Sequence, residues 1–245
     1  MLQIDARGMH YRDLNKMIKE AAWAGETDFV LDNVNGQRYI GTGVDRKINI
    51  TINGIPGNDL AAFANGPVIT VNANAQDAIG NTMNDGLIVV HGLAGDVLGY
   101  GMRGGRLYIR DDVGYRVGIH MKEYRRQVPV LIAGGTAGDF FGEYMAGGIM
   151  MLLGLHRRPG QPLAGDYLGT GMHGGVIYLR GEVEPHRLGK EVAVFELDGG
   201  DEQILQKYLG EYCTFFGLDY NQVREEKFYK LVPVSHRPYG RLYAG

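Results

Sequence analysis

Glycine recurs at a fixed spacing along the middle of the chain, and this internal repeat constrains the fold more than any other feature of the sequence. Three steps of 19 residues and then steps of 24 and 27 separate the members of the repeat, which are Ala61, Gly80, Gly99, Gly118, Gly142 and Gly169. A run of four mostly apolar residues follows each member, from residues 68–71 in the first unit to residues 176–179 in the last. A period of about 20 residues indicates a solenoid.

The contents of each unit exclude most kinds of solenoid. A helical repeat usually needs more than about 30 residues, and each of the several glycines in a unit would cost a helix about 1 kcal/mol. The frame of a leucine-rich repeat is absent, and the spacing lacks the multiples of six that mark a left-handed hexapeptide β-helix. We therefore predict an all-β solenoid, a single-stranded right-handed parallel β-helix of about seven coils, with strands about 4.8 Å apart.

A methionine lies three residues after each glycine of the repeat. These methionines are Met83, Met102, Met121, Met145 and Met172. Thioethers can bind Cu(I), but a metal needs ligands that converge on one point, whereas stacked coils hold equivalent atoms in a line. We therefore interpret the column as a packed ladder inside the solenoid, because methionine fills irregular gaps well.

Glycine and aspartate form further columns at the predicted corners of the coils. A second glycine column consists of Gly86, Gly105, Gly148 and Gly175. Both glycine columns should supply positive φ angles or close backbone approach. Residues 99–104 fit the phosphate-binding pattern G-x-G-x-x-G, but a strand and not a helix is predicted after them. An acidic column consists of Asp77, Asp96, Asp139 and Asp166. These carboxylates are expected to accept hydrogen bonds from turn N–H groups, and calcium binding is the alternative.

Five stretches of the repeat carry a family resemblance, namely residues 55–63, 74–86, 114–124, 138–148 and 169–178. They closely resemble the GXGXG domain, the C-terminal β-helix domain of the glutamate synthase large subunit, and the resemblance covers most of the chain before the C-terminal region. It implies a right-handed β-helix without catalytic or cofactor-binding residues, encoded here as a separate subunit. A more distant resemblance is to the β-helical subunit of formylmethanofuran dehydrogenase.

The resemblance to glutamate synthase also implies what partner chains would do. That enzyme makes glutamate from glutamine and 2-oxoglutarate, and its glutaminase nucleophile, FMN and iron–sulfur cluster lie in other domains. The expected role is therefore a non-catalytic scaffold, inactive alone, with glutaminase and FMN/iron–sulfur synthase subunits as partners. The alternatives are a scaffold of another oxidoreductase and a free-standing β-helix enzyme. Against the latter, the sequence shows no cluster of paired acids with Arg or Lys.

Composition and charge give no indication of binding to nucleic acid or to membranes. The 245 residues are 44% hydrophobic and carry a formal charge of −3. No apolar run is long enough to span a bilayer. The single cysteine, Cys213, cannot form an internal disulfide, which favours a cytoplasmic location.

The N-terminal segment is predicted to be a helix that precedes the solenoid. Residues 11–25 have apolar side chains at helical spacing, and Gly25 is placed to end the helix. The first coil of a solenoid exposes a strand edge and an open core, so this helix is expected to act as a cap. The first strands are expected at residues 29–31 and 48–52.

The repeat stops after residue 197, which divides the chain into a β-helix domain (1–197) and a C-terminal extension (198–245). Apolar spacing in the extension predicts a helix at 201–217 and a second, short helix at 219–228. An aperiodic stretch with two prolines, 232–240, is expected to be an extended tail. The extension either closes the last coil or holds a neighbouring chain, so that a homo-oligomer is one alternative.

Basic residues mark the surfaces that we expect to contact partners. Two coils contain extra residues, within 122–129 and 153–164, and each of these insertions carries a pair of arginines. If each methionine points inward, the residue after it should point outward. The candidate docking residues from both arguments are Arg103, Lys122, Arg125, Arg126, Arg157, Arg158 and His173. They are either simply solvated or docking points for an acidic partner surface.

Overall fold

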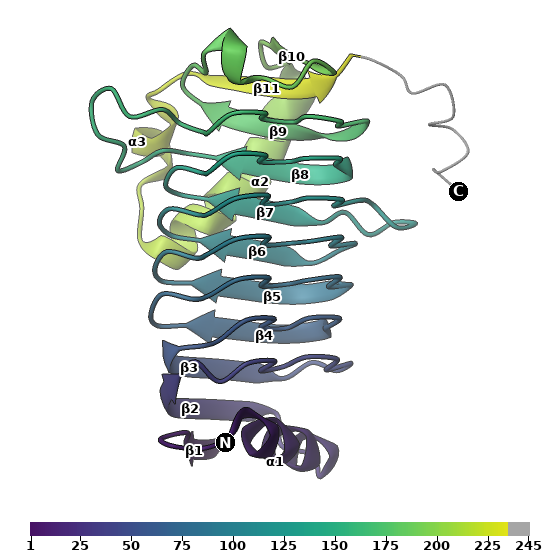
Figure 1. Cartoon of the computed structure of the whole chain (residues 1–245), viewed down its shortest axis with the longest axis vertical. Helices are drawn as coiled ribbons and strands as arrows, with labels where there is room; N and C mark the ends of the chain where they lie inside the picture. Colours follow the sequence, from purple (N-terminus) through teal and green to yellow (C-terminus); the bar gives the residue numbers. More distant parts are fainter. Residues whose placement is uncertain (235–245) are drawn as a thin grey trace.

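The chain folds into a parallel β-helix, as predicted. The computed structural model describes residues 1–234, in which eleven strands form one sheet in the order β1-β2-β3-β4-β5-β6-β7-β8-β9-β11-β10 (Figure 1). The strands are β1 (Leu2–Asp5), β2 (Asp28–Asn35), β3 (Asn49–Ile55), β4 (Asn65–Val71), β5 (Asp85–Val90), β6 (Arg106–Ile109), β7 (Val130–Ala133), β8 (Ala146–Leu152), β9 (Gly174–Arg180), β10 (Val192–Phe195) and β11 (Phe228–Pro233). The helices are α1 (Tyr11–Trp23), the 3-10 helix η1 (Pro185–Arg187), α2 (Gly199–Phe216) and α3 (Tyr220–Arg224).

The four-residue runs identified in the sequence are the ones that pair. Their first residues align from β3 to β9 in the order Asn49, Val68, Leu87, Arg106, Val130, Ile149 and Val176. The chain thus makes six turns in constant register, close to the predicted number of about seven coils. A further turn, with a register shift between Asp32 and Val34, leads from β2 to β3. The two insertions enlarge the turns before β7 and β9 without changing the register.

Each coil contains a double β-turn centred on the repeated glycine. In the coil of Gly99, the N–H of Tyr100 donates to the carbonyl of Val97, and the N–H of Met102 donates to the carbonyl of Gly99. The φ angle is positive at Val97 (56°), Gly99 (64°) and Gly101 (56°). Glycine adopts such angles without steric cost, so the G-x-G pattern marks two of the three left-handed positions of the double turn.

The repeat begins one turn earlier than the sequence spacing indicated. Gly41 has a φ of 71°, and the N–H of Ala61 donates to the carbonyl of Ile40, as the equivalent N–H groups do in later coils. Gly41 therefore precedes Ala61 in the glycine column by 20 residues. This is the seventh, degenerate coil predicted from the strand at residues 48–52, but Gly41 was not placed in the glycine column because Val44 occupies the methionine position of its coil.

Two apolar cores lie on the two sides of the sheet. One fills the interior of the solenoid and includes the methionine column. The other lies between the outer face of β5–β9 and α2, where Tyr108 and Tyr178 of the sheet contact a face that includes Leu209 and Tyr212. Figure 1 shows α2 crossing behind the strands from β9 towards β6. The C-terminal extension is thus packed along the side of the solenoid as well as at its end.

The N-terminal end agrees with the predicted cap and adds one strand to it. Leu14, Ile18 and Ala22 of α1 are buried in the interior core. Gly25, with a φ of 103°, follows the helix end. The unpredicted strand β1 pairs in parallel with β2 and lies outside the repeat, which explains why periodicity did not reveal it.

The C-terminal end closes the last coil, which was one of the two predicted alternatives. β11 pairs antiparallel with β9, and β10 pairs antiparallel with β11, so the backbone groups of β9 are covered. The predicted helix 219–228 is mostly wrong, since only α3 is helical there and Phe228 begins β11. Of the predicted tail, residues 232 and 233 belong to β11, and residues 235–240 lie outside the described residues. None of the helices in residues 1–234 is long and apolar enough to cross a bilayer.

Candidate docking surface

The candidate docking residues lie on two opposite edges of the solenoid. Four of them are exposed on the edge where the strands begin, namely Arg103, Lys122, Arg125 and Arg126. His173 lies on the same edge but is half-buried, with its Nδ1 3.2 Å from the carbonyl oxygen of Gly171. Insertion 122–129 projects from this edge before β7, whereas insertion 153–164 projects from the opposite edge beside α3 (Figure 1). A single flat partner surface cannot contact both.

Insertion 122–129 is an ordered hairpin that presents two arginines at its tip. The N–H of Tyr124 donates to the carbonyl of Gln127 (3.1 Å), and the N–H of Gln127 donates to the carbonyl of Tyr124 (3.0 Å). The Gln127 amide also donates to the carbonyl of Asn84 (2.9 Å), which ties the hairpin to an earlier coil. Arg125 and Arg126 are the two residues between these bonded positions, and both are exposed.

Insertion 153–164 is tied to the C-terminal part of the chain. Arg157 is half-buried and lies 3.6 Å from the Glu226 carboxylate, which also pairs with Arg180 at 2.7 Å. Arg158 is exposed. The ion pair of Arg157 is an internal contact that the sequence did not indicate, so Arg158 is the more accessible member of this arginine pair.

A column of stacked rings lies beside the basic residues and was not identified from the sequence. His120 stacks on Tyr144, with ring centroids 5.4 Å apart and an interplanar angle of 10°. Tyr100 packs edge-on against His120 at 5.8 Å. A Cβ at Gly171, the equivalent position of the next coil, would lie 2.3 Å from Cδ1 of Tyr144. The second glycine of that G-x-G therefore leaves room for the ring below it.

A second column of rings runs along the other side of the double turns. Phe140 stacks on Tyr167 with centroids 4.9 Å apart and an interplanar angle of 10°. The guanidinium of Arg116 lies over the Phe140 ring at 4.4 Å and forms an ion pair with Glu143. These contacts fix the rings in place, so the surface is organised before any partner binds.

The two columns and the hairpin together form a surface that we call the double-turn edge. Its exposed residues include Tyr100, Arg103, Tyr115, Lys122, Tyr167 and the hairpin tip Arg125–Arg126. Tyrosine and arginine are the residue types enriched at the energetic centres of protein interfaces. Within residues 1–234, Arg103, Lys122, Arg125 and Arg126 form no ion pair, so their charge is available to a partner. The basic edge contrasts with the negative formal charge of the chain.

The acidic column holds successive coils together. Asp77 accepts a hydrogen bond from the N–H of Asp96 (2.9 Å), and Asp96 accepts one from the N–H of Tyr115 (2.9 Å). Asp139 accepts one from the N–H of Asp166 in the same way (2.8 Å). The acceptor role was predicted correctly for these three residues, but the N–H groups belong to the next coil and not to the same turn. Asp166 instead accepts a hydrogen bond from the Arg187 guanidinium (2.9 Å). Among residues 1–234, no three His, Cys, Asp or Glu side chains are grouped as metal ligands.

The phosphate-loop alternative for residues 99–104 is wrong. The N–H of Gly99 donates to the carbonyl of Ile79 in the preceding coil, and the N–H of Gly101 donates to the carbonyl of Ile119 in the following coil. These glycines thus use their N–H groups to join coils. A loop that binds phosphate needs such groups free.

The stacked register and the glycine-centred double turns define a β-helix protein built on a G-x-G repeat. The GXGXG motif family model matches residues 27–234, and the chain belongs to this family. The chain is 47% identical to the uncharacterized protein MJ1350 of Methanocaldococcus jannaschii, over 98% of this chain and 95% of that protein.

A solved structure shares the same fold. It is a chain of the formyltransferase/hydrolase complex from Methylorubrum extorquens, solved in complex with methylofuran. The TM-score is 0.64 at 20% sequence identity, and the match covers 85% of this chain and 78% of that chain. This likeness shows that the two chains share a fold.

Proposed function

We propose that this chain is a non-catalytic scaffold subunit of a glutamate synthase assembled from separate subunits. The observation that carries this proposal is its membership of the GXGXG family, whose model matches residues 27–234. In the proposed cytoplasmic complex, glutaminase and FMN/iron–sulfur subunits make glutamate from glutamine and 2-oxoglutarate. This chain supplies no cofactor and positions those subunits.

The use of buried polar groups supports a scaffold role. Tyr178 donates a hydrogen bond to Asp201 at the start of α2 (2.7 Å), and Lys230 of β11 pairs with the same carboxylate (2.7 Å). Tyr108 donates to Glu211 further along α2 (2.9 Å). These groups hold α2 and β11 against the sheet. They are therefore engaged in structural contacts and not directed towards a substrate.

The double-turn edge is the surface that we propose for the FMN/iron–sulfur subunit. Its unpaired cations fit an acidic partner surface, and its ordered tyrosines would supply apolar contact at little entropic cost. Reversing Arg103 and Lys122 to Glu should leave the fold intact, because both side chains are exposed. The double variant should lose association, since like charges would then face an acidic partner.

Affinity purification from the native cell, with mass spectrometry of the retained chains, tests the proposal. The wild-type chain should retain a glutaminase chain and a flavin-containing synthase chain. Arg103→Glu/Lys122→Glu should retain less of the flavin chain, while the control Arg158→Glu on the opposite edge should behave as wild type. Retention of neither chain would contradict the proposal.

The second candidate function is a scaffold subunit of another oxidoreductase, such as formylmethanofuran dehydrogenase. The shared fold with a chain of the Methylorubrum extorquens complex favours it. Retention of formylmethanofuran dehydrogenase subunits in the same purification would select this candidate over glutamate synthase.

A further inference from the structure

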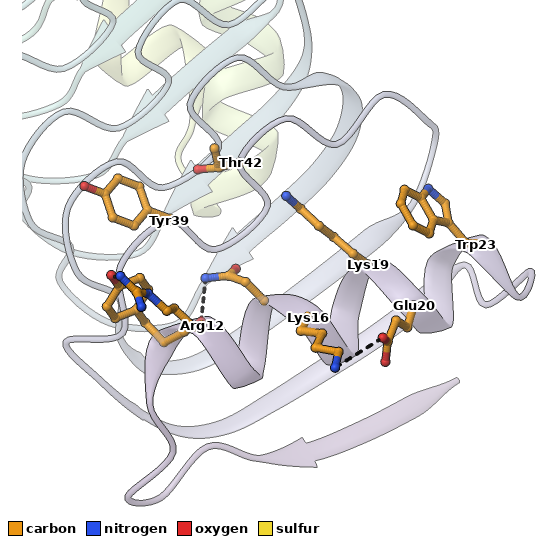
Figure 2. A pocket seen from close by; sticks show the side chains of 9 residues that line it. Arg12, Lys16, Lys19, Glu20, Trp23, Tyr39 and Thr42 are labelled. Atoms are coloured by element: carbon orange, nitrogen blue, oxygen red, sulfur yellow. Dashed lines mark hydrogen bonds and ion pairs between the residues drawn. The ribbon is translucent and has the colours of Figure 1, made fainter.

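A groove runs along the outer side of α1, at the opposite end of the molecule from β10 and β11 (Figures 1 and 2). It has a volume of about 390 Å³ and lies between α1 and the turn that holds Tyr39 and Thr42. Along its helical wall, Arg12, Lys16, Lys19 and Trp23 succeed one another at i, i+4, i+7 and i+11. This spacing aligns their side chains on one face of the helix, opposite the buried face.

Trp23 is unusually accessible for a large aromatic side chain. It is the only tryptophan of the chain and is 74% exposed, although tryptophans are on average well covered. Met17 on the same helix is 42% exposed and Tyr39 across the groove is 39% exposed. Exposed aromatic groups at both ends of one groove, bordered by charges, indicate a contact surface for another protein.

The two ends of the groove carry different groups that can bind each other. At the N-terminal end of α1, the rings of Tyr11 and Tyr39 lie 5.7 Å apart, and the guanidinium groups of Arg12 and Arg38 lie 5.8 and 5.3 Å from the Tyr11 ring. At the C-terminal end stands the uncovered indole of Trp23, and Figure 2 shows it far from Arg12 and Tyr39. One helix therefore carries both an aromatic group to insert and an aromatic and cationic site that can receive it.

One pair of charges on α1, Lys16 and Glu20, is complementary in the same sense. Lys16 lies in the first half of the helix and Glu20 in the second. Within one chain, Nζ of Lys16 lies 3.8 Å from the Glu20 carboxylate, and both side chains are exposed. If two α1 helices pack antiparallel about a two-fold axis, Lys16 of each copy lies opposite Glu20 of the other. The same arrangement brings Trp23 of each copy to Tyr11 and Tyr39 of the other.

We propose that α1 forms a two-fold symmetric interface between two copies of this chain, with Trp23 of each copy packed against Tyr11 and Tyr39 of the other. A symmetric interface requires that one surface carry both complementary parts, as this helix does. A helix of 13 residues is about 20 Å long, so the contact area is at the small end for specific interfaces. The dimer should therefore dissociate on dilution. The proposal does not depend on the scaffold function.

The purified full-length chain provides its own probe, since Trp23 is its only tryptophan. Over a dilution series, sedimentation velocity should show a change from dimer to monomer. The tryptophan emission should move to longer wavelength over the same range of concentration, because the indole returns to water. Trp23→Ala should be monomeric throughout, whereas the matched control Tyr167→Ala, an exposed aromatic of the double-turn edge, should dimerise as the wild type does.

Charge reversal tests the symmetry of the contact. Glu20→Lys should raise the dissociation constant at least about tenfold, since it places Lys16 opposite a second lysine. Adding Lys16→Glu to that variant should restore dimerisation, because both cross-axis pairs are re-formed with the charges exchanged. A monomer at every concentration would overturn the proposal, as would a dimer that survives Trp23→Ala or whose tryptophan emission does not change on dilution. A monomer that binds a different protein through Trp23 would assign the groove to that protein instead.

Discussion

Methionine and glycine are packing partners across successive coils. Cε of Met83 lies 2.6 Å from the place that a Cβ on Gly105 would occupy, and Cε of Met145 lies 2.6 Å from the equivalent place on Gly175. The tips of these two methionines thus fill the space left by the missing Cβ of the following coil. The methionine column and the second glycine column, which the sequence shows separately, therefore pack against each other.

Met102 allows a direct test of the interior ladder. It is fully buried, so Met102→Asp would place a carboxylate among apolar side chains and should prevent folding, because an unpaired buried charge costs several kcal/mol or more. Met102→Leu nearly conserves the volume and should cost less than about 1.5 kcal/mol. Circular dichroism and urea unfolding would measure both effects. A soluble Asp variant of unchanged stability would contradict the buried position.

Gly118 tests the close packing at the corner. A Cβ at this position would lie 2.3 Å from Sδ and 2.5 Å from Cε of Met150, and φ is 74°. Strained φ and overpacking together should make Gly118→Ala cost roughly 2 to 4 kcal/mol.

Gly160 is the matched control for this substitution. It also has a positive φ, 79°, but no atom lies within 4 Å of its added Cβ. Gly160→Ala should therefore cost only the strain, about 1 kcal/mol. Equal losses in urea unfolding for the two alanine variants would show that packing against Met150 contributes nothing.

Among the contacts between helices and strands, those of Asp201 link α2 and β11 to the sheet. Burial raises the pKa of Asp201, but hydrogen bonds from Lys230, the Asp198 N–H and Tyr178 outweigh burial, so its pKa lies below the ordinary value. A carboxyl group with a lowered folded pKa stabilises the fold above its unfolded pKa of about 3.9. This stabilisation is lost as the pH falls through the folded pKa.

Asp201→Asn should therefore change the pH dependence of stability as well as its size. The variant should be less stable than the wild type at neutral pH, and the difference should shrink as the pH falls below about 4. Urea unfolding at a series of pH values would measure both. A constant difference between the two proteins across that range would show that ionised Asp201 does not hold these elements.

The strands of the solenoid could be predicted because each repeats the same physical pattern. The apolar runs, the glycines with positive φ and the methionines recur with one period, so each unit supports the assignment of the others. β1, β10 and β11 occur once each and lack that support. The helical spacing of residues 201–217 predicted α2, but not that Tyr212 would donate to the backbone carbonyls of Ile109 and Arg110 on the outer face of the sheet.

The double-turn edge could be predicted only in part. Arg103 and Lys122 follow methionines, so strand alternation predicted their exposure. His120 and Tyr144 lie two residues after their repeat glycines, whereas Tyr100 lies one residue after Gly99, and only the actual path of the double turn brings the three rings together. A search for aromatic residues within two positions of each repeat glycine would have found them.

The whole molecule is expected to be inactive by itself. We predict that the purified chain is colourless and has neither glutaminase nor glutamate synthase activity, because a scaffold leaves the chemistry to its partners. Absorbance spectroscopy and assays of glutamine hydrolysis would check this. Flavin absorbance or turnover in the isolated chain would contradict a purely structural role.

Reconstitution of the complex tests the scaffold function most directly. Purified glutaminase and FMN/iron–sulfur subunits from the same organism would be mixed with and without this chain, and glutamine-dependent formation of glutamate from 2-oxoglutarate would be measured. We predict that this chain co-elutes with both subunits and increases the rate, and that Arg103→Glu/Lys122→Glu does so less well. Full activity of the two partners without this chain, together with separate elution, would contradict the proposed function.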